Sequence, residues 1–310
     1  MSESLESVAT RVVRWQASHG RSHLPWQQTR DPYRVWLSEI MLQQTQVSTV
    51  LGYYARFLER FPDVHALASA SQDEVLGLWS GLGYYSRARN LHRCAQLVVA
   101  EHGGVFPSSA ELLAKLPGIG RSTAGAIAAF CFSQRVPILD ANVRRVLTRV
   151  VGFDGDVAVA KNERALWEHA EALLPVSDLA AAMPRYTQGM MDLGAGVCTP
   201  KTPQCLICPL MGVCVAQKEG APERYPVKTR KLIRRSESWW LLLLIRLDRA
   251  VWLETRPSTG IWAGLQCAPT FPDRETAVNA AAAIAPLAPL REHAASLHVL
   301  THRDLHLHPL

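Results

Sequence analysis

Apolar residues recur at helical spacing through the first two thirds of the chain. Helix-length apolar stretches lie around residues 5–18, 33–60, 72–80, 86–101, 109–115, 123–133, 142–151, 161–174 and 178–193. Short helix-breaking segments separate them, such as Phe61-Pro62, Gly103-Gly104, Leu116-Pro117-Gly118 and Gly152. No long stretch before residue 225 alternates with a period of two. The pattern therefore predicts a mainly α-helical body.

The pattern changes after Tyr225-Pro226. Residues 227–235 are rich in lysine and arginine, which predicts a basic linker, either a solvated connector or a segment that contacts phosphates. Beyond it, the sequence predicts strands at 239–246, 250–256 and 296–301 and an alanine-rich helix at 275–284. This α+β module is short for a stable domain, so we expect the sequence to be a piece of a longer chain.

Composition narrows the class of protein. A chain of 310 residues suits two or three modules, and 48% apolar against 19% charged residues excludes a disordered chain. The 33 basic and 27 acidic residues give a net charge of +6, which suits an acidic polymer without demanding one. No run of apolar residues is long enough for a membrane span, and the N-terminus lacks a secretory signal. We therefore expect a cytoplasmic protein with no membrane partner.

Four of the seven cysteines lie within seventeen residues, as Cys198, Cys205, Cys208 and Cys214. This C-x6-C-x2-C-x5-C spacing indicates an intracellular metal site and not a disulfide framework. Structural zinc more often uses two C-x2-C pairs, but thiolate ligands suit both zinc and iron–sulfur clusters, so the residues alone leave both open. The other three cysteines are expected in the core.

Two carboxylates are candidates for acid–base chemistry. Glu39 interrupts a nearly apolar stretch, and Gln43 and Gln46 follow at i+4 and i+7, so the three predict one polar stripe on a helix. The stripe faces either water or a cleft, and burial in a cleft would raise the pKa of Glu39 and make it a general acid. Asp140 precedes a periodic helix and is either a helix N-cap or a carboxylate that faces the cleft.

Two glycine-containing segments are candidates for DNA contacts. Leu116-Pro117-Gly118-Ile119-Gly120-Arg121-Ser122-Thr123 predicts a hairpin between two helices, which is either a plain turn or a phosphate site at a helix start. Gly81–Asn90 combines a loop, two tyrosines and two arginines. Phosphate contacts and base stacking need those residue types, although a packed tyrosine corner is the alternative.

Together these segments resemble the MutY-type adenine DNA glycosylases of the helix-hairpin-helix superfamily. The resemblance covers nearly all of residues 8–225 and includes the segments 36–47, 81–90, 116–125, 138–143, 190–195 and the cysteine loop. It implies two helical modules that flank a DNA cleft, formed by residues 29–135 and by 1–28 with 136–225. It also implies a linker at 226–237 and an incomplete Nudix-like domain at 238–310. The implied reaction removes adenine mispaired with 8-oxoguanine or guanine.

The resemblance also implies a role for individual residues. Glu39 matches the general acid that protonates adenine at N7, and Asp140 the carboxylate that stabilises the cationic sugar, the division of labour found in sugar hydrolysis. Asn142 matches a residue that orients the sugar site. The cysteines match ligands of one 4Fe–4S cluster. The residues expected to contact the flipped adenine or the rest of the DNA are Arg21, Gln43, Tyr84, Arg87, Gly118, Gly120, Ser122, Asn142, Thr301 and His302.

Ser122 separates this chain from similar lyases. Endonuclease III-like enzymes carry a lysine there that attacks the sugar, so a serine predicts a monofunctional glycosylase, and Arg144 in place of a lysine of some relatives points the same way. The C-terminal part lacks the carboxylates of a nucleotide-hydrolysing Nudix helix, so we expect it to recognise 8-oxoguanine through Leu300-Thr301-His302. The histidines of this part are expected to alternate along a strand.

The resemblance implies double-stranded DNA with A·8-oxoguanine or A·G mispairs as the partner. It further implies a bacterial-type, nucleoid-associated monomer that could meet a sliding clamp or an AP endonuclease. Two other functions remain open at this point: an endonuclease III-like glycosylase/lyase, and a catalytically silent DNA-binding protein that keeps the cluster.

Overall fold

The computed structural model describes residues 2–229 and 233–310, with side chains from residue 8 onward. The basic residues Arg230 and Lys231 of the predicted linker lie outside the described residues. The chain forms two compact units, Met1–Thr229 and Arg230–Leu310. Each unit is described by itself.

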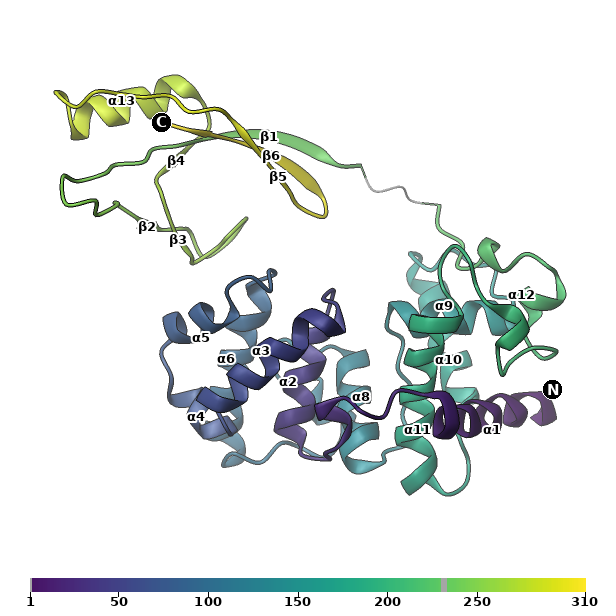
Figure 1. Cartoon of the computed structure of the whole chain (residues 1–310). Helices are drawn as coiled ribbons and strands as arrows, with labels where there is room; N and C mark the ends of the chain where they lie inside the picture. Colours follow the sequence, from purple (N-terminus) through teal and green to yellow (C-terminus); the bar gives the residue numbers. More distant parts are fainter. Residues whose placement is uncertain (1, 230–232) are drawn as a thin grey trace. The chain divides into compact units, whose positions relative to one another are not determined.

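The first unit is helical throughout the residues that the structure describes (Figure 1). Its α-helices are α1 (Ser2–His19), α2 (Pro32–Leu42), α3 (Val47–Arg60), α4 (Val64–Ser69), α5 (Gln72–Trp79), α6 (Ser86–His102), α7 (Ala110–Leu113), α8 (Arg121–Phe132), α9 (Ala141–Val151), α10 (Ala160–Ala172), α11 (Leu179–Asp192) and α12 (Val215–Lys218). Short helical turns are η1 (Pro25–Gln27), η2 (Leu193–Val197), η3 (Cys205–Ile207) and η4 (Pro222–Arg224). The predicted helical body is confirmed, although α4 and α12 were not predicted.

The apolar stretch at 33–60 forms two helices and not one. Helix α2 ends at Leu42 and α3 begins at Val47, with Gln46 as its N-cap. Gln44 between them adopts a left-handed conformation with φ +57°, which ends the first helix. The predicted polar stripe is therefore wrong, because Gln43 and Gln46 do not continue the helix that carries Glu39.

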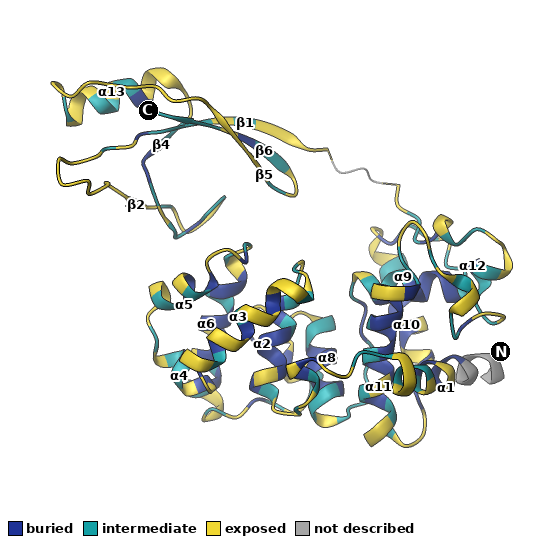
Figure 2. Ribbon diagram, in the orientation of Figure 1, coloured by how far each residue is buried: buried dark blue, intermediate teal, exposed yellow. Residues whose placement is uncertain are grey.

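Helix α2 lies in the centre of its half of the unit. Asp31 caps its start by accepting a hydrogen bond from the Tyr33 amide (2.9 Å), and Pro32 fits the first helical turn. Its side chains Trp36, Leu37 and Met41 are fully buried, and Figure 2 shows the helix as dark blue along much of its length. An apolar helix of this kind holds any polar side chain that it carries in a fixed position.

Helix α8 has small side chains that allow close packing. A Cβ atom at Gly125 would lie 2.6 Å from the carbonyl oxygen of Pro137, so only glycine lets the 136–139 segment cross the helix at this point. Helix α8 also packs against α2. The same helix therefore contacts both the segment that carries Glu39 and the segment that leads to Asp140.

The hairpin between α7 and α8 requires only one of its two glycines. Gly118 has φ +77°, and a Cβ there would lie 2.8 Å from the Cβ of Asn90. Gly120 is the N-cap of α8 in extended conformation, and a Cβ there would have open space around it. Gly120 thus leaves the start of α8 accessible to an approaching group.

The second unit is a small mixed sheet with one helix. Its strands run in the order β4-β1-β6-β5, formed by β1 (Arg235–Leu241), β4 (Thr270–Phe271), β5 (Ser296–Val299) and β6 (Arg303–Pro309). Strands β1 and β6 are parallel, whereas β4 and β5 pair antiparallel to their neighbours. A separate pair joins β2 (Glu254–Thr255) and β3 (Gln266–Cys267). Helix α13 (Arg274–Ile284) packs near β1 through Leu242, Ala277 and Leu310.

Two predictions about the second unit need correction. Strand β1 begins at Arg235 because that residue pairs with Arg303 of β6, so residues 235–237 belong to a strand and not to a linker. The predicted strands at 239–246 and 250–256 are confirmed only in part: residues 239–241 belong to β1, Glu254–Thr255 form β2, and Ile245 and Val251 form an isolated antiparallel bridge. None of the helices in the described part of the chain has the length and apolar character needed to cross a membrane.

Candidate active site

A cleft opens among the segment after α1, η1, α2, α8 and α11. Its lining includes the side chains of Arg21, Trp26, Glu39, Phe130 and Gln188. The cleft is open on one side and measures about 1330 Å³ when the solvent at its mouth is included. It combines an apolar wall with a few polar groups, as ligand sites commonly do.

Glu39 brings a carboxyl group into this cleft from the last turn of α2. Burial and, to a smaller extent, the negative charge of Asp140 together raise its pKa to about 8. The carboxyl group therefore holds its proton at neutral pH. Glu39 can therefore act as a general acid, as predicted for a glutamate that lines a cleft.

Asp140 is the N-cap of α9, and its Oδ1 accepts a hydrogen bond from the Val143 amide at 2.8 Å. Burial raises its pKa, while the amides of Val143 and Asn142 and the charges of Arg145 and Arg144 oppose that rise. Asp140 lies outside the lining of the described cleft, yet it is near enough to affect the pKa of Glu39. The N-cap interpretation is confirmed, and it is compatible with a place beside Glu39.

The backbone before Asp140 is held by α8. The hydroxyl oxygen of Ser122 accepts a hydrogen bond from the Leu139 amide at 3.0 Å, and the Pro137 carbonyl lies over Gly125. Ser122 is thus used within the protein. On the other side, the Asn142 side-chain oxygen accepts a hydrogen bond from Arg145 at 2.9 Å.

Arg21 is fixed at the rim of the cleft by a buried carboxylate. Its Nε donates to Asp192 Oδ1 (2.7 Å), its amide donates to Oδ2 (2.9 Å), and Nη2 lies 2.6 Å from Oδ1. Gln188 donates to the same carboxylate at 2.9 Å. Sequence reasoning missed Gln188 and Trp26 as lining residues. Gln188 could have been found, because it lies one helical turn before Asp192 in the helix predicted at 178–193.

Several predicted DNA-contacting residues lie away from this cleft, around a second, smaller pocket. Gln43, Arg87 and Gly118 line it, together with Asn90. Gln43 is half-buried and donates to the Thr123 hydroxyl at 3.4 Å, whereas its neighbour Gln44 is exposed. Tyr84 is exposed as well.

The prediction that Arg87 contacts phosphates is wrong. Its side chain is buried, and its terminal nitrogens donate to backbone carbonyls of the protein, among them Met41 at 2.9 Å and Gln43 at 2.6 Å. Donors used in this way are not available to a phosphate. In the second unit, Thr301 and His302 form the exposed turn between β5 and β6.

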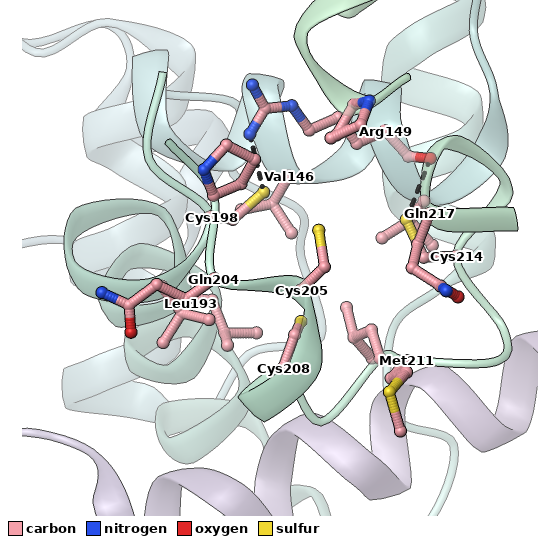
Figure 3. A pocket seen from close by; sticks show the side chains of 15 residues that line it. Val146, Arg149, Leu193, Cys198, Gln204, Cys205, Cys208, Met211, Cys214 and Gln217 are labelled. Atoms are coloured by element: carbon pink, nitrogen blue, oxygen red, sulfur yellow. Dashed lines mark hydrogen bonds between the residues drawn. The ribbon is translucent and has the colours of Figure 1, made fainter. Parts of the chain in front are cut away.

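The four clustered cysteines line one pocket in the first unit, which Figure 3 shows from close by. Cys198 directly follows η2, Cys205 begins η3, Cys208 directly follows η3, and Cys214 is the N-cap of α12. The surrounding side chains, such as Val146 and Met211, are mostly apolar. The four thiols therefore share one water-poor environment.

Arg149 is the buried cation of this pocket. Its Nη1 donates to the sulfur of Cys198 at 3.3 Å, and its own carbonyl accepts from the sulfur of Cys214 at 3.3 Å (Figure 3). Burial raises the pKa of Cys208 to about 11, and a bound metal would lower it again. Among residues 2–229 and 233–310, no three histidine, cysteine, aspartate or glutamate side chains converge on a point that could hold a single metal ion.

The sequence is similar to known repair proteins. Residues 37–172 match the HhH-GPD superfamily base excision DNA repair protein family. The adenine DNA glycosylase of Buchnera aphidicola subsp. Acyrthosiphon pisum is 41% identical over 268 residues, which cover 86% of this chain and 75% of that protein. The adenine DNA glycosylase of Rattus norvegicus is 46% identical over 204 residues, which cover 63% of this chain and 39% of that protein.

Solved structures confirm the fold class. A thermostable thymine-DNA glycosylase matches with a TM-score of 0.62 and 27% identity, over 70% of this chain and 98% of that one. A non-covalent endonuclease III–DNA complex matches with a TM-score of 0.54 and 21% identity, over 71% of this chain and 98% of that one, and shows the fold alone. The chain thus has the mainly helical HhH-GPD fold, with a small mixed sheet at its C-terminal end.

The raised pKa of Glu39 predicts a pH-dependent stability. The folded pKa of about 8 exceeds the ordinary value of 4.5 that the unfolded chain has. The contribution of Glu39 to the free energy of unfolding is therefore complete below pH 4.5 and is lost as the pH rises through 8. Glu39→Gln keeps a neutral side chain. Its free energy of unfolding relative to that of the wild type should therefore increase by more than about 1 kcal/mol from pH 5 to pH 8, as measured by urea unfolding.

The control for this prediction is Glu59→Gln, which removes an exposed carboxylate from α3. Its stability relative to the wild type should change little between the same two pH values. An equal pH dependence for both variants would contradict the burial of a protonated carboxyl group at position 39.

Proposed function

Since this chain belongs to the adenine DNA glycosylases of the HhH-GPD superfamily, we propose that it hydrolyses the bond between adenine and deoxyribose where adenine is mispaired with 8-oxoguanine or guanine. The chain is a base excision repair enzyme and a hydrolase, and DNA is its substrate. The mispair, the abasic product and the residues that act are the finer parts of the proposal.

The observation that carries the proposal is the carboxyl group of Glu39, which lines the cleft with a raised pKa to which the charge of Asp140 contributes. Adenine is a poor anionic leaving group, so its release needs a proton donor at N7. Glu39 holds a proton at neutral pH and faces the space that a flipped base would enter. An acid with a pKa near the working pH is the efficient choice for this transfer.

Asp140 supplies the second half of the reaction. As adenine leaves, positive charge develops on C1′ and the ring oxygen of the sugar, and a nearby carboxylate stabilises that charge or bonds to it transiently. Arg144, Arg145 and two amides favour the ionised form of Asp140 and oppose the effect of its burial. Asn142, held by Arg145, orients the sugar site, and water completes the hydrolysis.

Ser122 argues for a monofunctional enzyme. A lyase needs an amine at this position to form a Schiff base with the sugar, and a hydroxyl cannot do so. Its oxygen is also engaged with the Leu139 amide. The Arg144 guanidinium lies 3.4 Å from Glu163 and is no nucleophile. The endonuclease III-like lyase is therefore the weaker alternative.

We assign the DNA contacts to the exposed residues. Arg21 would support the flipped adenine from the rim of the cleft, and the open space at Gly120 would let a phosphate approach the start of α8. Gln44, which is exposed where Gln43 is engaged, would enter the duplex together with Tyr84. Thr301 and His302 would read 8-oxoguanine from the second unit, which we take as a Nudix-like domain. Extrusion of the adenine costs a few kcal/mol, which mispairing reduces.

We propose that the four cysteines hold one 4Fe–4S cluster. Four thiols set around an apolar pocket suit a cluster in which each iron takes one thiolate, and the buried Arg149 offsets the negative charge of such a site. The cluster would tie η2, η3 and α12 together. This chain's own contribution is to hold the four thiols and to donate the Arg149 hydrogen bond to Cys198.

The remaining parts of the proposal concern organisation and partners. Residues 29–135 would form the six-helix module, and residues 1–28 with 136–225 the cluster module, with the cleft between them. We propose a cytoplasmic, nucleoid-associated monomer. A sliding clamp or an AP endonuclease, which acts on the abasic product, would be its natural partner.

The proposal predicts alkali-dependent strand cleavage. A duplex with a single A·8-oxoguanine pair, incubated with the enzyme, should break at the adenine site only after treatment with hot alkali, because the enzyme leaves an intact abasic strand. Adenine release should fall as the pH rises above about 8, where Glu39 loses its proton. Glu39→Gln should lower the rate by at least about 10²-fold, since general acid catalysis contributes on that scale.

Glu59→Gln is the matched control and should keep the wild-type rate. Cleavage without alkali would point to the lyase, and no cleavage under either condition to the silent binding protein. Turnover by Glu39→Gln at the wild-type rate would contradict the role of the acid.

The cysteine assignment predicts a second outcome. Protein purified without oxygen should contain about four iron atoms per chain and absorb broadly in the visible range. Cys205→Ser should lose iron and visible absorbance, whereas Cys131→Ser, a cysteine on α8, should retain both. Stoichiometric zinc in place of iron would contradict the cluster.

A further inference from the structure

Two exposed side chains near the proposed DNA surface sit at unusual backbone positions. Gln44, between α2 and α3, has φ +57°, and Tyr84, before α6, has φ +49°. Left-handed conformations are uncommon for residues other than glycine, so the surrounding structure must hold them. Gln44 lies in the tight turn 42–45, closed by the Thr45 amide on the Leu42 carbonyl, and Tyr84 lies in the loop 82–85 that leads into α6; both side chains are exposed.

One buried side chain bonds to both turns. Arg87 Nη1 donates to the carbonyls of Ile40 (2.8 Å), Met41 (2.9 Å) and Gln43 (2.6 Å) at the end of α2. Its Nη2 donates to the Thr45 hydroxyl (3.1 Å) and to the carbonyls of Leu82 and Gly83 (3.3 Å each). The two nitrogens of one rigid group therefore fix two turns that are forty residues apart in sequence.

The chemistry of this contact requires a guanidinium. The last carbonyls of α2 carry no helical hydrogen bonds and a partial negative charge, which a cation satisfies. Arg87 is buried and lies with its charged carbon 5.5 Å from the Tyr84 ring centre, so it also supports that ring directly. A lysine would keep the charge but lacks the planar fork that reaches both turns.

We propose that Arg87 is a positioning residue that couples the α2–α3 turn to the Tyr84 turn, so that Gln44 and Tyr84 enter the duplex as one rigid wedge. The same group holds the end of the helix that carries Glu39, one turn away. Arg87 thereby fixes the positions of Gln44, Tyr84 and Glu39 relative to one another. This inference rests on the proposed release of adenine from mispaired DNA and extends it to the step that extrudes the base.

A double-mutant cycle tests the coupling. The variants are Arg87→Lys, Tyr84→Leu and both together, and the readouts are the single-turnover rate of adenine release and the fluorescence of 2-aminopurine placed opposite 8-oxoguanine, which rises on extrusion. Each single change should lower extrusion and rate about tenfold, the scale of one lost stacking contact. The double variant should lose clearly less than the hundredfold product of the two single losses, because part of the Arg87 effect acts through Tyr84.

The matched control is Arg93→Lys, the same exchange at an exposed position on α6, which should behave as the wild type. Losses that multiply to about a hundredfold in the double variant would overturn the proposal, since they would show that Arg87 and Tyr84 act independently of each other. If Arg87→Lys does not fold by circular dichroism, Thr45→Val replaces it, and a two- to threefold loss that becomes smaller in the Tyr84→Leu background is then expected. A wild-type enzyme that releases no adenine would contradict the proposed function itself, before the cycle is run.

Discussion

The partly buried carboxyl group of Glu39, whose pKa the charge of Asp140 helps to raise, is the constraint on which the site depends. Two acidic groups that act on each other electrostatically cannot both ionise without cost, and burial makes that cost larger. The proton stays on Glu39, where its pKa is about 8, while amides and arginines favour the charge on Asp140. One environment thus yields an acid and a base from the same functional group.

The helices of the first unit hold Glu39 and Asp140 in place. Apolar packing fixes α2 and its glutamate, and the small residues of α8 let the 136–139 segment cross close to it. Helix α9 then links the proposed catalytic site, through Asp140, to the pocket of the four cysteines. Asp140 caps its start, Arg145 bonds to Asn142 and to the carbonyls of Gly194 and Cys198, and Arg149 reaches the cysteine pocket.

Much of this arrangement could be predicted from the sequence, and the failures have physical reasons. The helical body and the capping role of Asp140 followed from apolar periodicity and from the residue types at helix starts. The break after Leu42 did not, because a glutamine rarely adopts a left-handed conformation and tertiary contacts from Arg87 stabilise it. For the same reason Arg87 was taken for a phosphate ligand. Burial of a cation depends on carbonyls that are distant in sequence. Strand β1 was misplaced because its partner residues in β6 lie 68 positions further along the chain.

The most direct test of this account is the titration of the Glu39 carboxyl group itself, by carbon-13 NMR of the labelled side chain in the wild type and in Asp140→Asn. The account predicts a pKa near 8 in the wild type and a lower value once the neighbouring charge is removed, with burial still keeping it above 4.5. A wild-type pKa close to 4.5, or one that Asp140→Asn leaves unchanged, would contradict it.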